Sequence, residues 1–119
     1  RALTASAQFR GPVIGLAWDG DVLVALTQDR LFWRNERGRW TAGPAQPALG
    51  RLRAFVMDAR GAWLAGERGV GFAQLDAPVG SILTVGDLPA EPVDLALDAD
   101  HLWVGTLAGL VRFRLDALR

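Results

Sequence analysis

The chain contains no cysteine, no lysine and only one histidine. Without cysteine it can form neither disulfide bonds nor thiolate sites. Without lysine, Schiff-base chemistry and the lysine of a phosphate-binding loop are both excluded. The single imidazole, His101, cannot build a histidine cluster, and no serine lies in a G-x-S-x-G nucleophile motif. The sequence therefore predicts no catalytic residue, no metal site and no cofactor.

Charge and hydropathy narrow the class of protein further. Thirteen basic residues balance thirteen acidic ones, and nucleic-acid binding depends on clustered positive charge, so no nucleic-acid partner is expected. No uncharged stretch reaches the roughly 18 residues of a membrane-spanning helix, so no membrane span is expected either. Half of the 119 residues are hydrophobic, which predicts one compact domain with a core.

Two segments forty positions apart, residues 57–64 and 97–104, carry one pattern without a gap. Among the identical residues that a shift of 40 aligns are Asp58 with Asp98, Trp63 with Trp103, Gly69 with Gly109, Leu75 with Leu115 and Asp76 with Asp116. A shift of 39 in the other direction aligns Phe55 with Leu16, so a more diverged copy begins near Val13. A period near forty with short apolar runs and Gly or Asp turns is typical of the four-stranded blades of β-propellers.

Each copy divides into apolar runs that predict strands. The first strands are expected at Val13–Trp18, Leu52–Met57 and Val93–Leu97, and the second at Val22–Thr27, Ala62–Gly66 and Leu102–Thr106. The third strands are expected at Leu31–Asn35, Val70–Leu75 and Leu110–Leu115, and the outer strands at Arg39–Ala42, Ser81–Val85 and Ala2–Ala5. The second strands are apolar at nearly every position, as expected where neighbouring sheets cover both faces.

The predicted fold class is therefore all-β, a β-propeller of three four-stranded antiparallel blades in a single segment, 1–119. Residues 1–12 would be the outer strand of a preceding blade, 13–50 blade 1, 51–91 blade 2, and 92–119 the first three strands of blade 3. Closed propellers use roughly four to eight blades, so three leave two apolar end faces. We expect these faces to be covered by another copy, which would make the chain half of a six-bladed ring, or by the rest of a larger propeller or complex.

The third copy resembles a known family. Its run Leu102-Trp103-Val104-Gly105-Thr106, followed by Gly109-Leu110, is similar to the L-W-[VI]-G-T-x-x-G-L signature of the two-component regulator propeller repeat. That resemblance implies a bacterial propeller that binds partners or ligands, often in the extracytoplasmic sensor region of a signalling protein, and a motif without catalytic residues. With Arg1 in place of an initiator methionine, it leads us to expect a periplasmic or secreted location.

Polar loops between second and third strands are the candidate binding region. They hold Gln28, Asp29, Arg30, Glu67 and Arg68, which would converge on one rim of the blades.

The five tryptophans could stack on sugars, but position favours a structural role for most of them. Trp63 and Trp103 share one repeat position and are expected between blades, and Trp18 and Trp40 are interpreted as structural. Trp33, where other copies have Phe72 and Arg112, is the best candidate for an exposed contact. A carbohydrate or a peptide would be the ligand.

Recurring aspartates at corresponding corners, Asp19, Asp58 and Asp98, could be read as a ring of cation ligands. Turn chemistry accounts for them better, because an Asp side chain caps the backbone two residues on.

The leading functional hypothesis is a non-enzymatic binding or scaffolding module that mediates protein or ligand interaction, with extracytoplasmic sensing as one form of it. Two alternatives stay open. One is an accessory subunit of a larger membrane-associated complex, which would also cover the end faces. The other is a propeller-based sugar lyase or hydrolase that uses carboxylates such as Asp29 and Glu67, although glycoside chemistry needs a matched acid and base.

Overall fold

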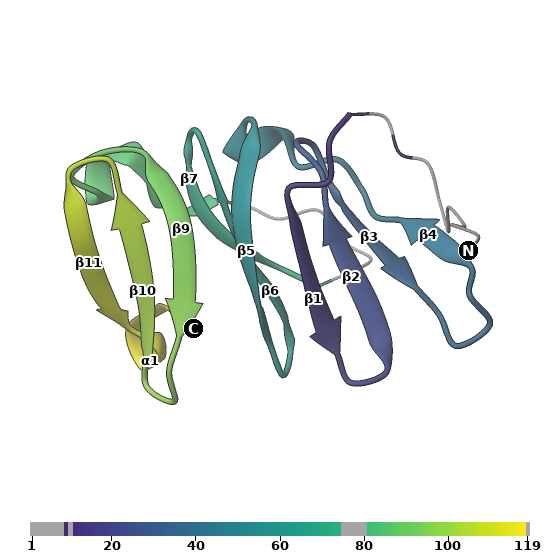
Figure 1. Ribbon diagram of the computed structural model, residues 1–119. Helices are drawn as coiled ribbons and strands as arrows, with labels where there is room; N and C mark the ends of the chain where they lie inside the picture. The colour runs from purple at the N-terminus through teal and green to yellow at the C-terminus, as the bar shows by residue number, and fades with distance from the viewer. Residues whose placement is uncertain (1–8, 10, 75–80, 119) are drawn as a thin grey trace, which may run out of the picture.

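The computed structural model describes residues 9, 11–74 and 81–118 of the chain. It is an all-β structure of three antiparallel sheets, which follow one another in chain order and lie side by side (Figure 1). The all-β prediction is therefore confirmed. In each sheet every strand pairs with the next strand in the sequence.

The elements have the following bounds. Sheet 1 contains β1 (Gly15–Asp19), β2 (Val22–Leu26), β3 (Leu31–Arg34) and β4 (Trp40–Ala42). Sheet 2 contains β5 (Leu52–Asp58), β6 (Gly61–Gly66), β7 (Gly69–Ala73) and β8 (Ser81–Thr84). Sheet 3 contains β9 (Pro92–Leu97), β10 (His101–Thr106) and β11 (Gly109–Arg114). Two 3-10 turns, η1 (Pro47–Leu49) and η2 (Val85–Asp87), precede β5 and β9, and a short helix, α1 (Leu115–Leu118), follows β11.

The predicted strands in the described part of the chain all form, with ends within two residues of those expected. The expected outer strand at Ala2–Ala5 lies outside the described residues. Helix α1 was not predicted, because Leu115 continues the alternating apolar pattern of β11 and was expected to end that strand. Positions forty apart hold corresponding places in the ladders, since Val56 pairs with Trp63 and Ala96 with Trp103.

Sheet 2 is packed between the other two sheets. Strand β6 is buried at all six of its residues because alternate side chains point to opposite faces and both faces are covered. On one face Ala62 and Leu64 join a core with Val24, Leu26 and Leu31 of sheet 1.

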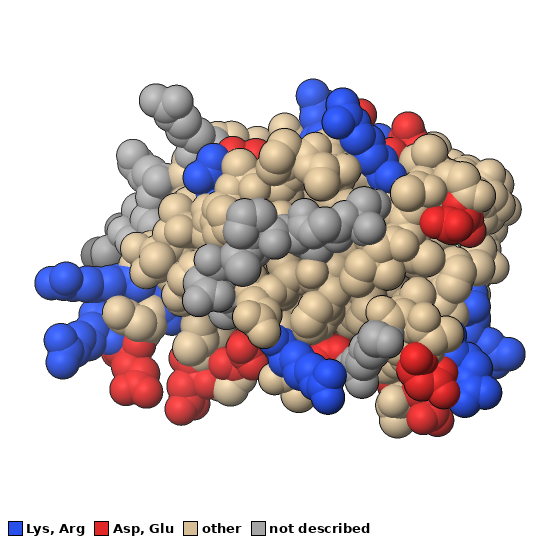
Figure 2. Space-filling model, turned by 180° about the vertical axis from the view of Figure 1, so that it is seen from behind, with Lys and Arg blue, Asp and Glu red and all other residues tan. Residues whose placement is uncertain are grey.

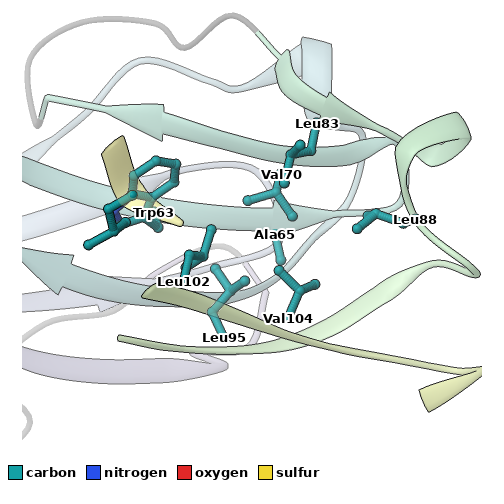
Figure 3. Close-up of a cluster of buried hydrophobic side chains, with 9 residues drawn as sticks. Trp63, Ala65, Val70, Leu83, Leu88, Leu95, Leu102 and Val104 are labelled. Carbon is teal, nitrogen blue, oxygen red and sulfur yellow. The ribbon is translucent and has the colours of Figure 1, made fainter. Parts of the chain in front are cut away.

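The second core lies between sheets 2 and 3. Trp63, Ala65 and Val70 of sheet 2 meet Leu102 and Val104 of β10 there, and Figure 3 shows these side chains pointing toward one another. Two apolar layers therefore hold three sheets together.

The stack measures 47 × 28 × 26 Å. Charged side chains gather along its upper and lower rims in Figure 2, and the band between them is largely uncharged on the face shown. These rims hold the turns and connectors, while the strands supply the apolar layers. No helix in the described residues is long and apolar enough to cross a membrane.

Gly69 tests how closely β7 and β8 pack, and Gly20 serves as the control for backbone strain. Gly69 starts β7 with a φ of +146°, and a Cβ there would collide with the carbonyl oxygen of Leu83 in β8. Gly20, between β1 and β2, has a φ of +60° and open space around it. We expect Gly20→Ala to lower the free energy of unfolding by about 1 kcal/mol through backbone strain alone. Gly69→Ala should lower it by about 2–4 kcal/mol, since β8 must also shift. Urea unfolding measures both, and equal losses would contradict the close packing of β8 at Gly69.

Candidate functional site

The structure brings five of the six predicted binding residues to one rim. Gln28, Asp29 and Arg30 form the turn after β2, and Glu67 and Arg68 form the turn after β6. Both turns are fastened to the connector between sheets 1 and 2. The Leu52 N–H donates to the Gln28 carbonyl at 2.8 Å, and the Arg68 N–H donates to the Leu49 carbonyl at 2.9 Å.

The two rim carboxylates are already engaged in these turns. Asp29 accepts a hydrogen bond from the Thr27 hydroxyl at 3.0 Å and pairs with the Arg30 guanidinium at 3.0 Å. The Arg30 hydrogen bond holds the pKa of Asp29 below its usual range, burial opposes that shift, and the Thr27 bond adds to it. Glu67 accepts the Arg51 backbone N–H at 2.9 Å. Both carboxylates therefore stabilise the turns to which they belong.

A shallow groove of about 190 Å³ crosses the first strands of all three sheets. Its lining residues are Ile14, Gly15, Leu16, Arg53, Ala54, Phe55, Val93 and Asp94. Arg53, near its rim end, pairs with Glu91 at 2.7 Å and so links sheets 2 and 3. Pockets for drug-sized ligands usually span about 300–1,000 Å³, so this groove fits a single side chain or a very small ligand.

Two hollows lie at the opposite edge, around the turns that precede β6 and β10. One of about 230 Å³ is apolar and lined by Arg60, Trp63, Phe72, Ile82 and Leu118. The other, of about 450 Å³, is lined by Arg60, Ala99, Asp100, Arg114, Leu115 and Asp116, and its two arginines face two aspartates. Because the two positive and two negative side chains balance, this hollow favours neither an anionic nor a cationic ligand. In the described parts of the chain, no three His, Asp or Glu residues are grouped to hold a metal ion.

The outward face of sheet 1 carries large exposed apolar side chains. Leu16 is 65 % and Trp18 66 % exposed. They pair with Ala25 and Leu23, on the face of the sheet that points away from the core with sheet 2. We call this surface the sheet 1 end face.

An aromatic group occupies the outer part of the sheet 1 end face. Phe9 lies against Phe32, with ring centroids 4.5 Å apart, and meets Trp40 edge-on at 5.2 Å. The apolar character of this face therefore extends from β1 to β4.

The outward face of sheet 3 is the other end of the stack. It presents Trp103, Leu110 and Arg112, because these residues alternate with the core residues Leu102 and Val104 and their partners. Leu110 is 67 % exposed. The Arg112 guanidinium lies over the Trp103 ring at 5.5 Å, a cation–π contact. We call this surface the sheet 3 end face.

Trp103 has a buried counterpart forty residues earlier. The Trp63 indole N–H donates to Asp58 at 3.1 Å, and that of Trp103 donates to Asp98 at 2.8 Å. Yet Trp63 is only 1 % exposed, because sheet 3 covers it, whereas Trp103 is half-buried.

The next aligned pair shows a larger contrast, since Val70 is fully buried and Leu110 is 67 % exposed. At these two positions the sheet 3 end face thus repeats a surface that is buried inside the stack, whereas Arg112 stands where sheet 2 has Phe72.

The same comparison applies at the sheet 1 end face. Phe55 and Met57 of β5 pack partly buried against the core with sheet 1. Leu16 and Trp18 hold the aligned positions in β1, and no described sheet lies outside them. Each end face therefore corresponds to one half of an interface that the stack already contains.

The tryptophans correct three sequence expectations. Trp63 is in the core as predicted, but Trp103, which was expected between blades as well, is half-buried on the sheet 3 end face. The structural interpretation of Trp18 is wrong, since this side chain is 66 % exposed at the end of the stack. Trp33 is not an exposed contact, because pairing with Val24 places it on the inward face of sheet 1, half-buried against the first core. It lies apart from the rim turns. The missed signal was the position of Trp18 on the first strand of the first sheet.

Two of the three corner aspartates, Asp58 and Asp98, cap turns as predicted, whereas Asp19 accepts no such hydrogen bond from a described residue. The side chain of Asp58 accepts the Arg60 N–H at 2.9 Å, and that of Asp98 accepts the Asp100 N–H at 2.9 Å. Three donors on one carboxylate, led by the Trp103 indole and followed by the backbone N–H groups of Asp100 and His101, lower the pKa of Asp98 to about 2.

Replacing Trp103 by Phe removes the largest of these causes. We expect the pKa of Asp98 to rise from about 2 toward its ordinary 3.8, without reaching it, because the backbone donors remain. The folded chain favours the ionised form, so this contribution to stability is complete above about pH 4 and is lost as the pH falls through about 2. NMR titration of the Asp98 carboxyl carbon measures both values. An unchanged pKa would contradict the role of the indole.

In comparisons with protein-family models, curated proteins and solved structures, nothing matches this chain.

Proposed function

We propose that the chain is a non-enzymatic binding or scaffolding module of the β-propeller type, whose three sheets are consecutive blades of an incomplete ring. The order of the sheets supports this, since each is a meander that follows the previous one in the chain. Neighbouring sheets approach through their first and second strands, β1 and β2 with β5, and β5 and β6 with β9. Such contacts are expected of sheets that radiate from one axis.

The observation that carries the proposal is the exposure of the two end faces. Leu16, Trp18 and Leu110 are 65–67 % exposed, at positions whose counterparts pack inside the stack. Covering a large apolar side chain contributes roughly 1.5–3 kcal/mol. Three such side chains, with the aromatic group around Phe9, offer a partner sheet enough apolar surface to offset part of the cost of association. The end faces are therefore the binding surfaces of the module.

The other candidate sites are less suited to be the main function. A glycoside-cleaving enzyme needs two carboxylates poised as acid and base, whereas Asp29 and Glu67 are bound within their own turns. The groove across the first strands is about 190 Å³ and fits one side chain. A peptide or sugar contact at the rim would thus be secondary to the end faces.

The proposed setting follows from the third copy. The motif Leu102–Thr106 with Gly109 and Leu110 supports a propeller of the two-component regulator type that works outside the cytoplasm. There the module would assemble with partner sheets, as a scaffold or as an accessory subunit of a larger complex.

Association should depend on the end faces alone. We expect the purified chain to form a species heavier than its 12.8 kDa monomer at raised concentration in sedimentation equilibrium. Trp18→Gln should shift this equilibrium to the monomer by at least tenfold, because a polar amide replaces the indole at the interface. Its circular dichroism should stay that of a β protein.

Leu107→Gln is the matched control, since Leu107 is 71 % exposed but lies in the turn between β10 and β11, off both faces. It should associate like the parent chain. A parent chain that stays monomeric at every concentration, or equal association of all three proteins, would overturn the proposal.

A further inference from the structure

The two hollows around the turns that precede β6 and β10 lie at the lower edge of Figure 1, where sheets 2 and 3 meet. We infer that together they bind a free α-amino acid with a bulky apolar side chain, such as phenylalanine. The apolar hollow takes the side chain, Arg60 binds the carboxylate and Asp100 binds the ammonium group. This site is separate from association through the end faces, so either can exist without the other.

The two hollows share one side chain. Arg60 lines both the apolar hollow of about 230 Å³ and the polar hollow of about 450 Å³. Helix α1 also borders both, through Leu118 in the apolar hollow and through Leu115 and Asp116 in the polar one. The hollows are therefore adjacent, and one ligand beside Arg60 can reach into both.

The apolar hollow is suited to an aromatic or branched aliphatic group. Its walls include Trp63 and Phe72, whose rings meet edge to face with centroids 4.9 Å apart. Trp63 lies at one end of the second core (Figure 3), and Ile82 and Leu118 complete the apolar lining. An engineered apolar cavity of about 150 Å³ binds benzene, so a hollow of about 230 Å³ has room for one phenyl ring.

The polar hollow offers one positive and one negative group that are not already paired. Arg114 and Asp116 neutralise each other through two hydrogen bonds of 3.1 and 2.8 Å. Arg60 and Asp100 are exposed and form no ion pair with each other or with another described residue. They stand on turns of different sheets, so their charges are held apart across the hollow. A ligand that carries both charges complements them.

An α-amino acid has its charges and its side chain in the arrangement that this site requires. A guanidinium binds a carboxylate through two parallel hydrogen bonds, and a carboxylate accepts hydrogen bonds from an ammonium group. Because Arg60 also borders the apolar hollow, a carboxylate bound there brings the side chain on the same α-carbon to that hollow. A phosphate ligand is disfavoured, since Asp100 and Asp116 would repel it. A neutral sugar would leave both charges without a partner.

Arg60 is the residue that departs from the repeat at this place. The aligned positions hold Asp21 in sheet 1 and Asp100 in sheet 3. The turn does not need the arginine side chain, because Asp58 caps it through the Arg60 backbone N–H at 2.9 Å. Direct pairing between the sheets does not account for the arginine either, since Arg60 and Asp100 form no ion pair. Its side chain is therefore available to a ligand.

Calorimetric titration with L-phenylalanine tests the inference. We expect one saturable site per chain with a dissociation constant of about 1 mM or below. Three analogues each lack one group, namely phenylalaninamide the carboxylate, N-acetylphenylalanine the ammonium group and glycine the ring. Each should bind about tenfold more weakly or worse, because a charge-assisted hydrogen bond or the burial of the ring is lost.

Variants assign the two charges to their residues. Arg60→Gln and Asp100→Asn should each weaken phenylalanine binding about tenfold or more. Arg60→Gln should cause little further loss with phenylalaninamide, because this analogue already lacks the group that Arg60 binds. Two exposed residues on the β3–β4 and β1–β2 turns provide matched controls, Arg37→Gln and Asp21→Asn, which should bind like the parent chain. Trp18→Gln should also bind phenylalanine normally, so the result does not depend on association through the end faces.

Several results would overturn the inference. One is the absence of saturable phenylalanine binding up to about 10 mM. Another is unchanged binding in Arg60→Gln or Asp100→Asn, or an equal loss in their controls. Phenylalaninamide or N-acetylphenylalanine that binds as tightly as phenylalanine would assign the site to a peptide terminus instead of a free amino acid. Glycine that binds equally well would exclude the apolar hollow from the site.

Discussion

A sheet that is apolar on both faces must be covered on both faces, and this constraint governs the whole molecule. In sheet 2 the constraint is met, and β6 is buried along its entire length between the two cores. Sheets 1 and 3 are each covered by sheet 2 on one side. Their outward faces still carry large apolar side chains, although Arg112 and Arg114 also lie on that of sheet 3. The exposure of Trp18 and Leu110 follows from their places at the ends of the stack. Function is therefore proposed at the end faces.

The turns and connectors at the rims have a different role, which is to hold neighbouring sheets against one another. The turn after β2 is fastened to the connector that leads into sheet 2, by Leu52 to Gln28, and the turn after β10 is fastened to the connector that precedes its own sheet, by Leu107 to Glu91. The pair of Arg53 with Glu91 adds a further link between sheets 2 and 3. The polar turn residues that the sequence predicted to bind a ligand thus help to hold the apolar layers together. An exposed ion pair contributes little by itself, so the layers carry most of the stability.

Much of the fold could be predicted from the sequence, because period and alternation report directly on strands and faces. The aligned pairs Asp58–Trp63 and Asp98–Trp103 form the same hydrogen bond, from the indole N–H to the carboxylate, in both sheets. The exposure of individual tryptophans was harder to predict. Trp33 points inward because its ladder pairs it with Val24. Trp18 pairs with Leu23 on the outward face, and it is exposed because no described sheet lies outside β1. Register within a sheet and position within the stack decide such cases, and neither is visible in a single residue or its neighbours.

The central claim is that both end faces are covered when the protein is assembled. Hydroxyl-radical footprinting with mass spectrometry measures this directly, with the buried Trp63 and the exposed Leu107 as internal references. The account predicts that, in the assembled protein, Trp18 and Trp103 react as slowly as Trp63 and that Leu110 reacts far more slowly than Leu107. End-face side chains that react as fast as free surface residues at every protein concentration would contradict it.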